Sequence, residues 1–236
     1  MTAIMKREFK AYFASPLGFV FLAIFYFFFG FFYVLSSLSM NSPDLSPVFG
    51  SMFVICLLLI PMLTMRLIAD DKKQKTDQLL LTSPTGLASI VLGKFFAAYI
   101  MYLVALAISV VFALINMFAT AEFPFVSFIG NLVALLALGA GLIAIGTFIS
   151  SLTESTVISV IITYAVFVFI LLFEALTTII KFEWFYDYVI IPLSVNGRFS
   201  EFTSGIFSLS NIIFFISMAA IFLFLTVRSL ESKRWS

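Results

Sequence analysis

The residues of this chain best suited to chemistry lie in one charged stretch between two apolar runs. Two carboxylates, Asp70 and Asp71, come directly before two ammonium groups, Lys72 and Lys73. A helix through this stretch would have a charged face and would present the leucines of residues 79–81 near its end. An apolar tip flanked by charges is unfavourable in water but suits a groove on a soluble partner protein. The pattern therefore predicts a docking segment rather than a catalytic centre.

Residues that typically support catalysis or hold a cofactor are scarce in the rest of the sequence. There is no histidine, which removes the commonest general base and metal ligand. The single cysteine, Cys56, lies in an apolar run that is typical of a buried packing residue, and it has no partner for an internal disulfide. The sequence has no GxxxxGK[ST] phosphate loop, so it lacks a Walker-type site for ATP. We expect no catalytic residue, metal, cofactor or nucleic-acid partner.

The composition requires lipid as the solvent for most of the chain. Of the 236 residues, 63% are hydrophobic and 11% are charged, which is more apolar surface than a soluble core of this size can bury. A membrane-spanning helix takes about 20 apolar residues. The pattern predicts an all-α membrane protein in which residues 1–236 form a single transmembrane domain. Its six predicted spans are residues 17–38, 48–69, 94–117, 128–149, 155–177 and 210–228.

The N-terminal segment, residues 1–16, precedes the first span and is amphipathic. Its apolar side chains fall on one half of a helix: Ile4, Met5, Phe9, Tyr12 and Phe13. Its cations fall on the other half: Lys6, Arg7 and Lys10. A basic helix of this kind lies in the membrane interface with its cations toward anionic cytoplasmic headgroups. The alternative is a frayed basic tail.

The distribution of charge along the chain predicts its orientation in the membrane. If the N-terminus is inside, only Lys181 and Arg198 of the 13 basic residues lie outside. The acidic residues that fall outside are Asp44, Glu122, Glu183, Asp187 and Glu201. This asymmetry is the one that the positive-inside rule describes. We therefore expect a multi-pass protein of the cell membrane, inner or plasma, with both termini in the cytoplasm.

The segment between the fifth and sixth predicted spans, residues 178–209, is too apolar for a solvated loop. It is interrupted at Pro192 and at Asn196–Gly197, and it is therefore too short for a further span. Four apolar residues repeat at helical spacing and predict a short amphipathic helix that dips into the outer leaflet: Phe199, Phe202, Ile206 and Phe207. An external gate and an interfacial anchor both fit this extracytoplasmic re-entrant or interfacial segment.

Two features inside the spans predict how helices bend and pack. Pro61 removes a backbone donor and should kink or end the second helix just before its cytoplasmic extension. The fourth span carries small residues four apart, which allow another helix to approach closely: Gly130 and Ala134, Ala137 and Gly141, and Ala140 and Ala144. Packing inside one subunit and association of two subunits both explain this spacing.

The charged stretch should fold as two helices joined by a sharp turn. The pattern predicts that a helix leaves the membrane at Arg66 and ends at Thr82. Ser83 can then cap a second short helix with Pro84 at its first position. That second helix would re-enter the membrane near Lys94.

This stretch resembles the permeases of type-2 ABC transporters. In that family the second span is followed by an acidic pair, basic residues, a Gly-Thr-x-Glu element, a leucine run, Thr-x-Pro and Leu-Gly-Lys. This chain has, in the same order, Asp70-Asp71, Lys72-Lys73, Thr76, Leu79 to Leu81, Thr82-Ser83-Pro84 and Leu92-Gly93-Lys94. It departs at Lys75, where the family usually has Gly, and at Gln78, where it usually has Glu. The resemblance covers essentially the whole length and is closest to the permeases of gliding-motility and copper-maturation systems.

The resemblance implies a permease subunit of an ABC transporter, with export favoured as the direction. It implies that two permeases, identical or related, associate in the bilayer with two cytoplasmic ABC ATPase subunits. Residues 70–83 would form the coupling helix, within a cytoplasmic coupling segment of residues 70–92. The residues that it assigns to coupling are Asp70, Asp71, Lys72, Lys73, Thr76, Asp77, Gln78, Leu79, Leu80, Thr82 and Pro84.

Three other functions compete with this interpretation. An ion-coupled secondary transporter usually carries ionisable residues deep in its spans, whereas Glu154 and Glu174 lie near predicted span ends and Arg66 lies at the cytoplasmic boundary. A non-transporting scaffold that anchors an ATPase fits the sequence, since a permease fold does not require flux. A membrane enzyme is disfavoured by the missing histidine and the lack of a carboxylate cluster.

The predicted topology can be tested with single cysteines in a background that lacks Cys56. We expect Asp44→Cys and Glu183→Cys to react with an impermeant thiol reagent added to intact cells, because their loops lie outside. Lys73→Cys and Trp235→Cys should react only after the membrane is permeabilised. Any other division of the four sites would contradict the six-span topology.

Overall fold

The computed structural model describes residues 1–40, 42–74, 86–119, 123–179 and 194–234, and every regular element in these ranges is a helix. The order of the elements is α1 (Thr2–Ala14), α2 (Pro16–Phe32), the π-helix η1 (Tyr33–Leu38), α3 (Ser46–Thr64), α4 (Ala69–Lys73), α6 (Leu87–Ala119), α7 (Phe125–Leu152), α8 (Thr156–Ile179), α11 (Val195–Thr203) and α12 (Leu209–Arg234).

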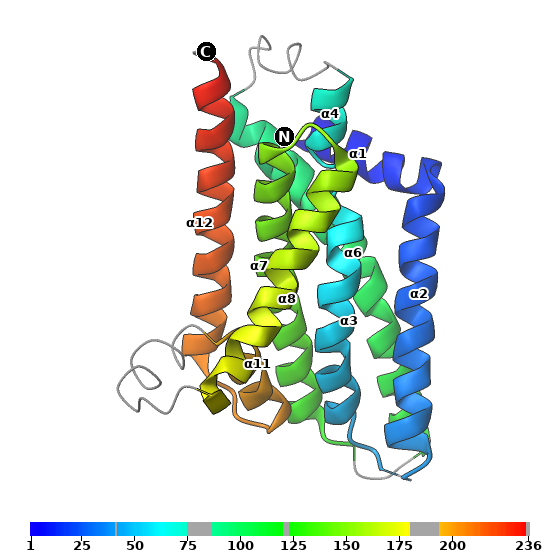
Figure 1. Cartoon of the computed structure of the whole chain (residues 1–236). Coiled ribbons are helices and arrows are strands. Elements are labelled where there is room, and N and C mark those ends of the chain that lie inside the picture. The colour runs from blue at the N-terminus through cyan, green and yellow to red at the C-terminus, as the bar shows by residue number, and fades with distance from the viewer. Residues whose placement is uncertain (41, 75–85, 120–122, 180–193, 235–236) are drawn as a thin grey trace.

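The long helices form one bundle with two distinct ends (Figure 1). The N-terminus, α4 and the C-terminal end of α12 lie at one end, and α11 lies at the other. α1 runs across the first end and turns into α2, which descends along the bundle. Pro16, at the first turn of α2, suits this corner because the missing N–H of proline is not needed there. We call the end with α1 and α4 the basal end, and the end with α11 the distal end.

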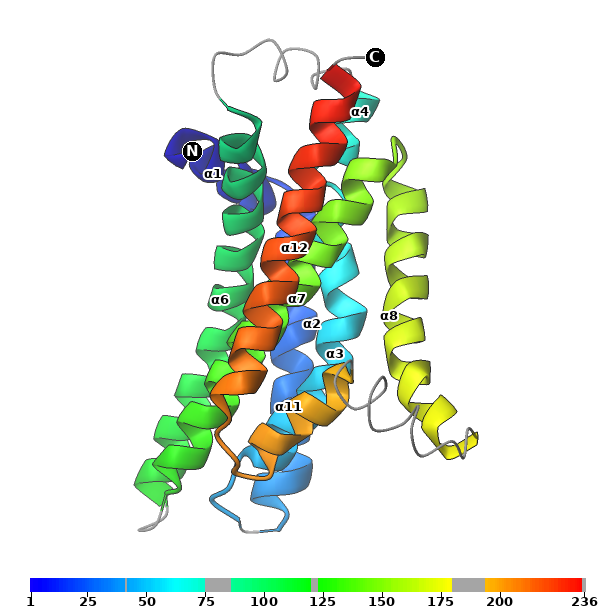
Figure 2. The same cartoon turned by 90° about the vertical axis from the view of Figure 1, so that its left-hand side faces the viewer.

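The helices match the predicted spans in number and position. Five are long and apolar enough to cross a membrane: Pro16–Leu38, Ser46–Lys73, Leu87–Phe118, Phe125–Leu152 and Leu209–Ser232. The fifth predicted span, residues 155–177, falls on α8, whose residues Thr156–Leu172 form a shorter apolar helix. Figure 2 shows α8 beside α3 at the margin of the bundle. The chain is therefore an all-α membrane protein, as the sequence predicts.

The expected continuous helix from the second span into the charged stretch is wrong. α3 ends at Thr64, one turn after Pro61, and a turn separates it from the five-residue α4. In that turn the backbone N–H groups of Ile68 and Ala69 donate to Ser150 Oγ, at 3.1 and 3.0 Å, instead of to the preceding helical carbonyls. The Ser150 side chain of α7 thus interrupts the backbone hydrogen-bond pattern of the helix. Periodicity within one segment of the sequence cannot predict such a contact.

The start of the third span also differs from the expectation. Gly86 lies in coil, and its carbonyl oxygen accepts from the N–H groups of Ser89 and Ile90, so that α6 begins at Leu87. From there one helix of 33 residues continues through the whole span. No separate short helix precedes Lys94 in residues 86–94. Ser83 and Pro84, the predicted cap and first position, lie outside the described residues.

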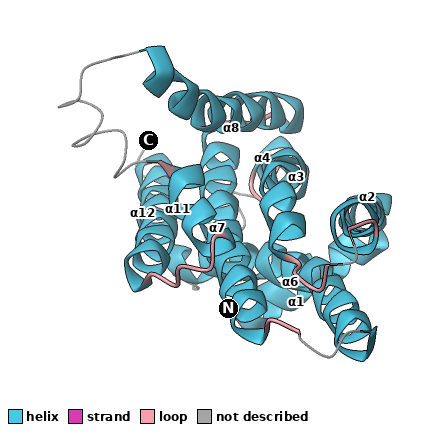
Figure 3. Cartoon of the chain, turned by 90° about the horizontal axis from the view of Figure 1, so that it is seen from below, coloured by secondary structure: helices cyan, strands magenta, loops and turns pink. Residues whose placement is uncertain are grey.

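α7 is the central helix of the bundle. It packs most extensively against α12 and then against α3, and Figure 3 shows it between these two helices. Its small residues lie at these contacts inside the subunit. A Cβ added at Gly139 would collide with the Tyr102 ring of α6, one at Gly141 with Met218 of α12, and one at Gly146 with Thr64 of α3. Packing within the subunit therefore accounts for these glycines.

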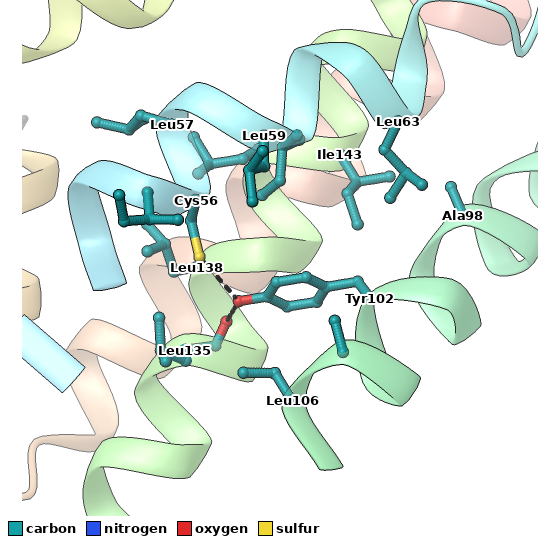
Figure 4. Close-up of a cluster of buried hydrophobic side chains, with 14 of the residues drawn as sticks. Cys56, Leu57, Leu59, Leu63, Ala98, Tyr102, Leu106, Leu135, Leu138 and Ile143 are labelled. Carbon is teal, nitrogen blue, oxygen red and sulfur yellow. Dashed lines mark hydrogen bonds between the residues drawn. The ribbon is translucent and has the colours of Figure 1, made fainter. Parts of the chain in front are cut away.

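Tyr102 is the polar centre of the core between α3, α6 and α7 (Figure 4). Its side chain is fully buried, and its hydroxyl donates to the Leu135 carbonyl oxygen at 2.9 Å. The same hydroxyl lies 3.5 Å from Cys56 Sγ. Cys56 is therefore a buried packing residue, as its apolar surroundings predict. The hydroxyl of a buried tyrosine requires such partners because it cannot reach water.

The distal helix α11 packs on the protein rather than lying apart from it. Phe199 and Phe202 are each 1% exposed, and the Phe199 ring stacks on Phe53 of α3 at 5.2 Å between centroids. α11 ends at Thr203 and Gly205 has a positive φ of 82°, so Ile206 and Phe207 lie beyond the helix and are exposed. The single four-residue stripe is therefore wrong, because a turn at Gly205 divides it.

A short polar network ties α11 to α12. Arg198 Nη1 donates to Asn211 Oδ1 at 2.9 Å, and Asn211 Nδ2 donates to Glu201 Oε2 at 2.6 Å. The Arg198 guanidinium also lies 4.5 Å from the centre of the Phe214 ring. Residues 180–193, which complete the predicted outer segment, lie outside the described residues.

The close approach of α7 and α6 predicts that one methyl group added at their contact destabilises the protein. Gly139→Ala should lower the free energy of unfolding by about 1–3 kcal/mol, because the new Cβ displaces a ring that is buried on all sides. Gly30→Ala is the matched control, since its Cβ would lie in ordinary contact, 3.7 Å from Phe112. Unfolding in mixed micelles measures both. Equal stability of the two variants would contradict the packing of Tyr102 on Gly139.

Candidate functional site: the base of the coupling segment

The described part of the predicted coupling segment begins at α4, at the basal end of the bundle (Figure 1). Of the residues assigned to coupling, the structure describes Asp70, Asp71, Lys72 and Lys73. The others lie outside the described residues: Thr76, Asp77, Gln78, Leu79, Leu80, Thr82 and Pro84. The four described residues do not form one charged face exposed to water. Asp71 and Lys72 make buried contacts that hold α4 in place, whereas Asp70 and Lys73 are more exposed.

Lys94 of α6 is the hub of the first set of contacts. Its side chain is 3% exposed, and its ammonium lies 2.7 Å from Asp71 Oδ2 and 3.1 Å from Glu8 Oε1. It also donates to the Leu67 carbonyl oxygen at 2.5 Å. The buried ammonium thus donates to oxygens of α1 and of the turn before α4, and it forms an ion pair with the Asp71 carboxylate of α4. One cation thus holds three segments of the chain together.

Lys72 and Ser150 make the second set of contacts, on the opposite side of α4. Lys72 is 7% exposed, and its ammonium donates to the carbonyl oxygen of Ser151 at the C-terminal end of α7. A lysine at that position satisfies an orphan carbonyl and interacts favourably with the negative end of the helix dipole. Ser150 in turn accepts from the N–H groups of Ile68 and Ala69. α4 and the end of α7 therefore cap each other.

Asp70 and Lys73 differ from Asp71 and Lys72 in their exposure. Asp70 Oδ2 lies 3.8 Å from Arg66 Nε, and the two side chains are 35% and 50% exposed. Lys73 is exposed at the end of α4. Exposed pairs of this kind contribute about 0–1 kcal/mol to stability. The adjacent carboxylates thus have separate roles: Asp71 faces the bundle and Asp70 faces its rim.

Contacts at both ends of α1 hold it against α3 and α6, beside the contacts around Lys94. Tyr12 is buried, and its hydroxyl donates to the Leu63 carbonyl oxygen of α3 at 2.8 Å. A Cβ at Gly93 would lie 3.2 Å from the Ile4 side chain and from the Met1 carbonyl oxygen. Glycine before Lys94 therefore allows α1 to lie close to α6. The helix predicted over residues 1–16 is confirmed as α1, with Lys6, Arg7 and Lys10 exposed.

The environment of Glu8 keeps it ionised. Burial raises the pKa of Glu8, but the charge of Lys94, hydrogen bonds from Arg7 and Lys94 and the charge of Arg7 outweigh this effect, and the net shift is downward. Arg7 Nη2 donates to Glu8 Oε1 at 2.6 Å. Glu8 therefore remains a carboxylate to lower pH than a free glutamate would, and it stays a partner for the buried ammonium of Lys94.

Sequence reasoning missed Glu8 and placed Lys94 only at a membrane boundary. Two signals were available in the sequence. Glu8 is the only acidic residue in α1 and lies one helical turn before the buried Tyr12, on the side of the helix that faces the bundle. Lys94 lies in an apolar context, where an unpaired ammonium is costly. Neither signal identifies the partner, because 86 residues separate Lys94 from Glu8.

Comparison with known families gives this junction its context. A family model described as ABC-2 family transporter protein matches residues 2–234. The chain belongs to this family. It is therefore a type-2 ABC transporter permease, and membership of this family implies association with an ABC ATPase. A search of curated proteins returned no match to the chain.

The family match spans every helix described above, including α1 and α4. The buried contacts of this ABC-2 permease lie where the resemblance placed the start of the coupling segment. Asp71 of the acidic pair contacts Lys94 of Leu-Gly-Lys, and Lys72 of the basic pair contacts the end of α7, so these three residues are joined through α4. The family match does not separate the gliding-motility and copper-maturation group from other ABC-2 permeases.

Removing the hub cation should destabilise this ABC-2 permease strongly. Lys94→Met should lower the free energy of unfolding by about 2–5 kcal/mol, because it leaves two partly buried carboxylates without their ammonium. Lys10→Met, which removes an exposed cation of α1, is the control and should change stability by less than about 0.5 kcal/mol. Unfolding in mixed micelles measures both.

A double variant separates the ion pair from loss of packing. Glu8→Gln should cost less in the Lys94→Met background than in the wild type, because the charge that it removes has already lost its buried partner and keeps only the exposed Arg7. Strict additivity of the two substitutions would contradict the assignment of Lys94 as the hub.

Proposed function

We propose that this chain is the permease subunit of an ABC exporter of the cell membrane and that residues 70–83 are its coupling helix. Two copies of a cytoplasmic ATPase would bind at the basal end, and a second permease subunit, identical or related, would complete the membrane pathway. The N- and C-termini would lie in the cytoplasm. The energy for transport would come from the ATPases, because the sequence has no phosphate loop of its own.

The observation that carries this proposal is the double anchoring of α4. On one side Asp71 is paired with Lys94, which also binds α1 through Glu8. On the other side Lys72 and Ser150 join α4 to the end of α7. A force applied to the residues that follow α4 would therefore reach α1, α6 and α7 together. A solvated loop that only marks topology needs no such buried contacts.

The mechanism follows from this connectivity. Closure of the ATPases around ATP would displace the coupling helices as rigid bodies. Because α7 is the central helix and packs on α3 and α12, movement at its basal end would change the packing of the whole bundle. Leu79 and Leu80 would fill the groove on the ATPase, and Asp71 and Lys72 would transmit the displacement into the membrane. This division assigns docking to the leucines and rigidity to the buried charges.

The arrangement of charge supports a cytoplasmic basal end. Lys6, Arg7 and Lys10 are exposed on α1, and Arg66, Lys73 and Arg228 lie on elements that end there. In the described residues the distal elements α11 and η1 contain one basic residue, Arg198. This distribution is the one expected when the basal end faces the cytoplasm.

The proposal predicts that Leu80 and Lys73 have different effects on assembly. Leu80→Asp should reduce the amount of ATPase that co-purifies with the permease at least about tenfold, because a carboxylate would be placed in a desolvated groove. Lys73→Ala should retain the ATPase, since an exposed charge at the rim contributes at most about 1 kcal/mol.

The control for this experiment is the amount of each variant in the membrane, followed with a fluorescent C-terminal tag. Both variants should insert at the wild-type level, because the substitutions lie outside the spans. Recovery of equal ATPase with Leu80→Asp and with wild type, at equal expression, would refute the coupling role of residues 70–83.

A further inference from the structure

A cavity of about 240 Å³ lies at the basal end, between α1, the start of α2, the turn into α4, and α6. Its walls carry both signs of charge together with apolar groups, and the residues that matter here are Glu8, Leu17, Arg66, Asp70, Asp71 and Lys94. Sites that enclose a whole drug-sized ligand occupy about 300–1,000 Å³. A space below that range suits a small polar group rather than a complete ligand.

The charged groups of the cavity differ in how completely they are engaged. Glu8 and Asp71 both lie on the buried ammonium of Lys94, and this ion cluster forms the inner wall. Arg66 and Asp70 are more exposed, and their closest atoms are 3.8 Å apart, beyond the length of a hydrogen bond. Both side chains therefore keep hydrogen-bonding capacity, one as a planar set of donors and the other as an acceptor.

The position of the cavity indicates where its ligand would come from. α1 is an amphipathic helix across the end of the bundle, and Leu17 belongs to the first turn of the first span. The cavity thus lies where a membrane-spanning helix meets an interfacial helix, which is the depth of lipid headgroups. A headgroup there could extend its glycerol and acyl chains along the apolar surface of α2 without leaving the bilayer.

We propose that this cavity binds the phosphoethanolamine headgroup of a membrane lipid. The phosphate would accept from the Arg66 guanidinium, whose planar fork suits a phosphate. The primary ammonium would donate to the Asp70 carboxylate, and Glu8 and Asp71 behind it make the inner wall favourable to a cation. The headgroup would replace one long Arg66–Asp70 contact with two charge-assisted hydrogen bonds.

The same chemistry disfavours other common headgroups. The quaternary ammonium of phosphatidylcholine has no N–H to donate to Asp70 and is larger. Phosphatidylglycerol carries no cation, so its phosphate could use Arg66 but nothing in its headgroup would pair with Asp70, in a cavity lined by the three carboxylates Glu8, Asp70 and Asp71 and the two cations Arg66 and Lys94. The site is therefore specific for a zwitterion with a primary ammonium. The inference concerns binding and does not depend on the partner that engages the residues after α4.

Native mass spectrometry of the full-length protein, released from detergent, tests the proposal. The probes are phosphatidylethanolamine, phosphatidylcholine and phosphatidylglycerol with the same acyl chains. We expect phosphatidylethanolamine to bind about tenfold more tightly than either of the others, as the one additional charge-assisted hydrogen bond from its ammonium to Asp70 would allow. Glycerophosphoethanolamine, which has no acyl chains, should compete weakly, which would identify a membrane lipid rather than a free metabolite as the ligand.

Two substitutions assign the two ends of the headgroup. Asp70→Asn should remove most of the preference for phosphatidylethanolamine over phosphatidylcholine, since it replaces the charged acceptor of the ammonium with a neutral amide. Arg66→Gln should weaken the binding of all three phospholipids at this site. Lys10→Gln is the matched control, because Lys10 is exposed on α1 and does not line the cavity; it should retain the wild-type preference.

The thermal stability of the wild-type protein provides a test that needs no variant. The unfolding temperature should rise with added phosphatidylethanolamine and should rise less with equal phosphatidylcholine. Equal binding and equal stabilisation by the two lipids would overturn the proposal. An undiminished preference for phosphatidylethanolamine in Asp70→Asn would also overturn it, because the ammonium would then be bound elsewhere.

Discussion

The burial of one ammonium group, that of Lys94, constrains the basal end of this permease. A cation that is 3% exposed is stable only when its donors are satisfied, and the oxygens that satisfy it come from α1, from α4 and from the turn between α3 and α4. Each of these segments must therefore bring an oxygen atom to Lys94 on α6. The position of α1 across the end of the bundle is consistent with that requirement.

The central helix α7 determines how far a displacement at that end can travel. Its glycines allow Tyr102, Met218 and Thr64 to pack directly on its backbone, so that α6, α12 and α3 are all fixed to it. α4 joins the same helix through Lys72 and Ser150. Close-packed helices transmit strain because there is little free volume to absorb it. α4, where the predicted coupling segment starts, is thus linked to the core through capping contacts as well as through ion pairs.

Different kinds of interaction stabilise the two ends of the bundle. At the basal end, charged side chains from separate helices converge on one buried cation. At the distal end, α11 is held by aromatic burial at Phe199 and Phe202 and by the network of Arg198, Asn211 and Glu201. Gly205, with its positive φ, separates α11 from α12. The basal contacts join helices that are distant in sequence, whereas the distal network joins neighbours in the chain.

The sequence by itself determined the membrane class, the six spans, the amphipathic N-terminal helix and the family, and it predicted the stretch proposed for coupling. These properties depend on local composition, periodicity and an ordered motif. Only the tertiary structure decided that the helix breaks between Thr64 and Ala69, that α6 is continuous from Leu87, and that Phe207 leaves the stripe of Phe199. It alone joined Glu8 to Lys94 and Ser150 to α4. Each of these features depends on a donor or acceptor supplied by a distant segment or on a turn that periodicity does not encode, and no local pattern specifies the partner.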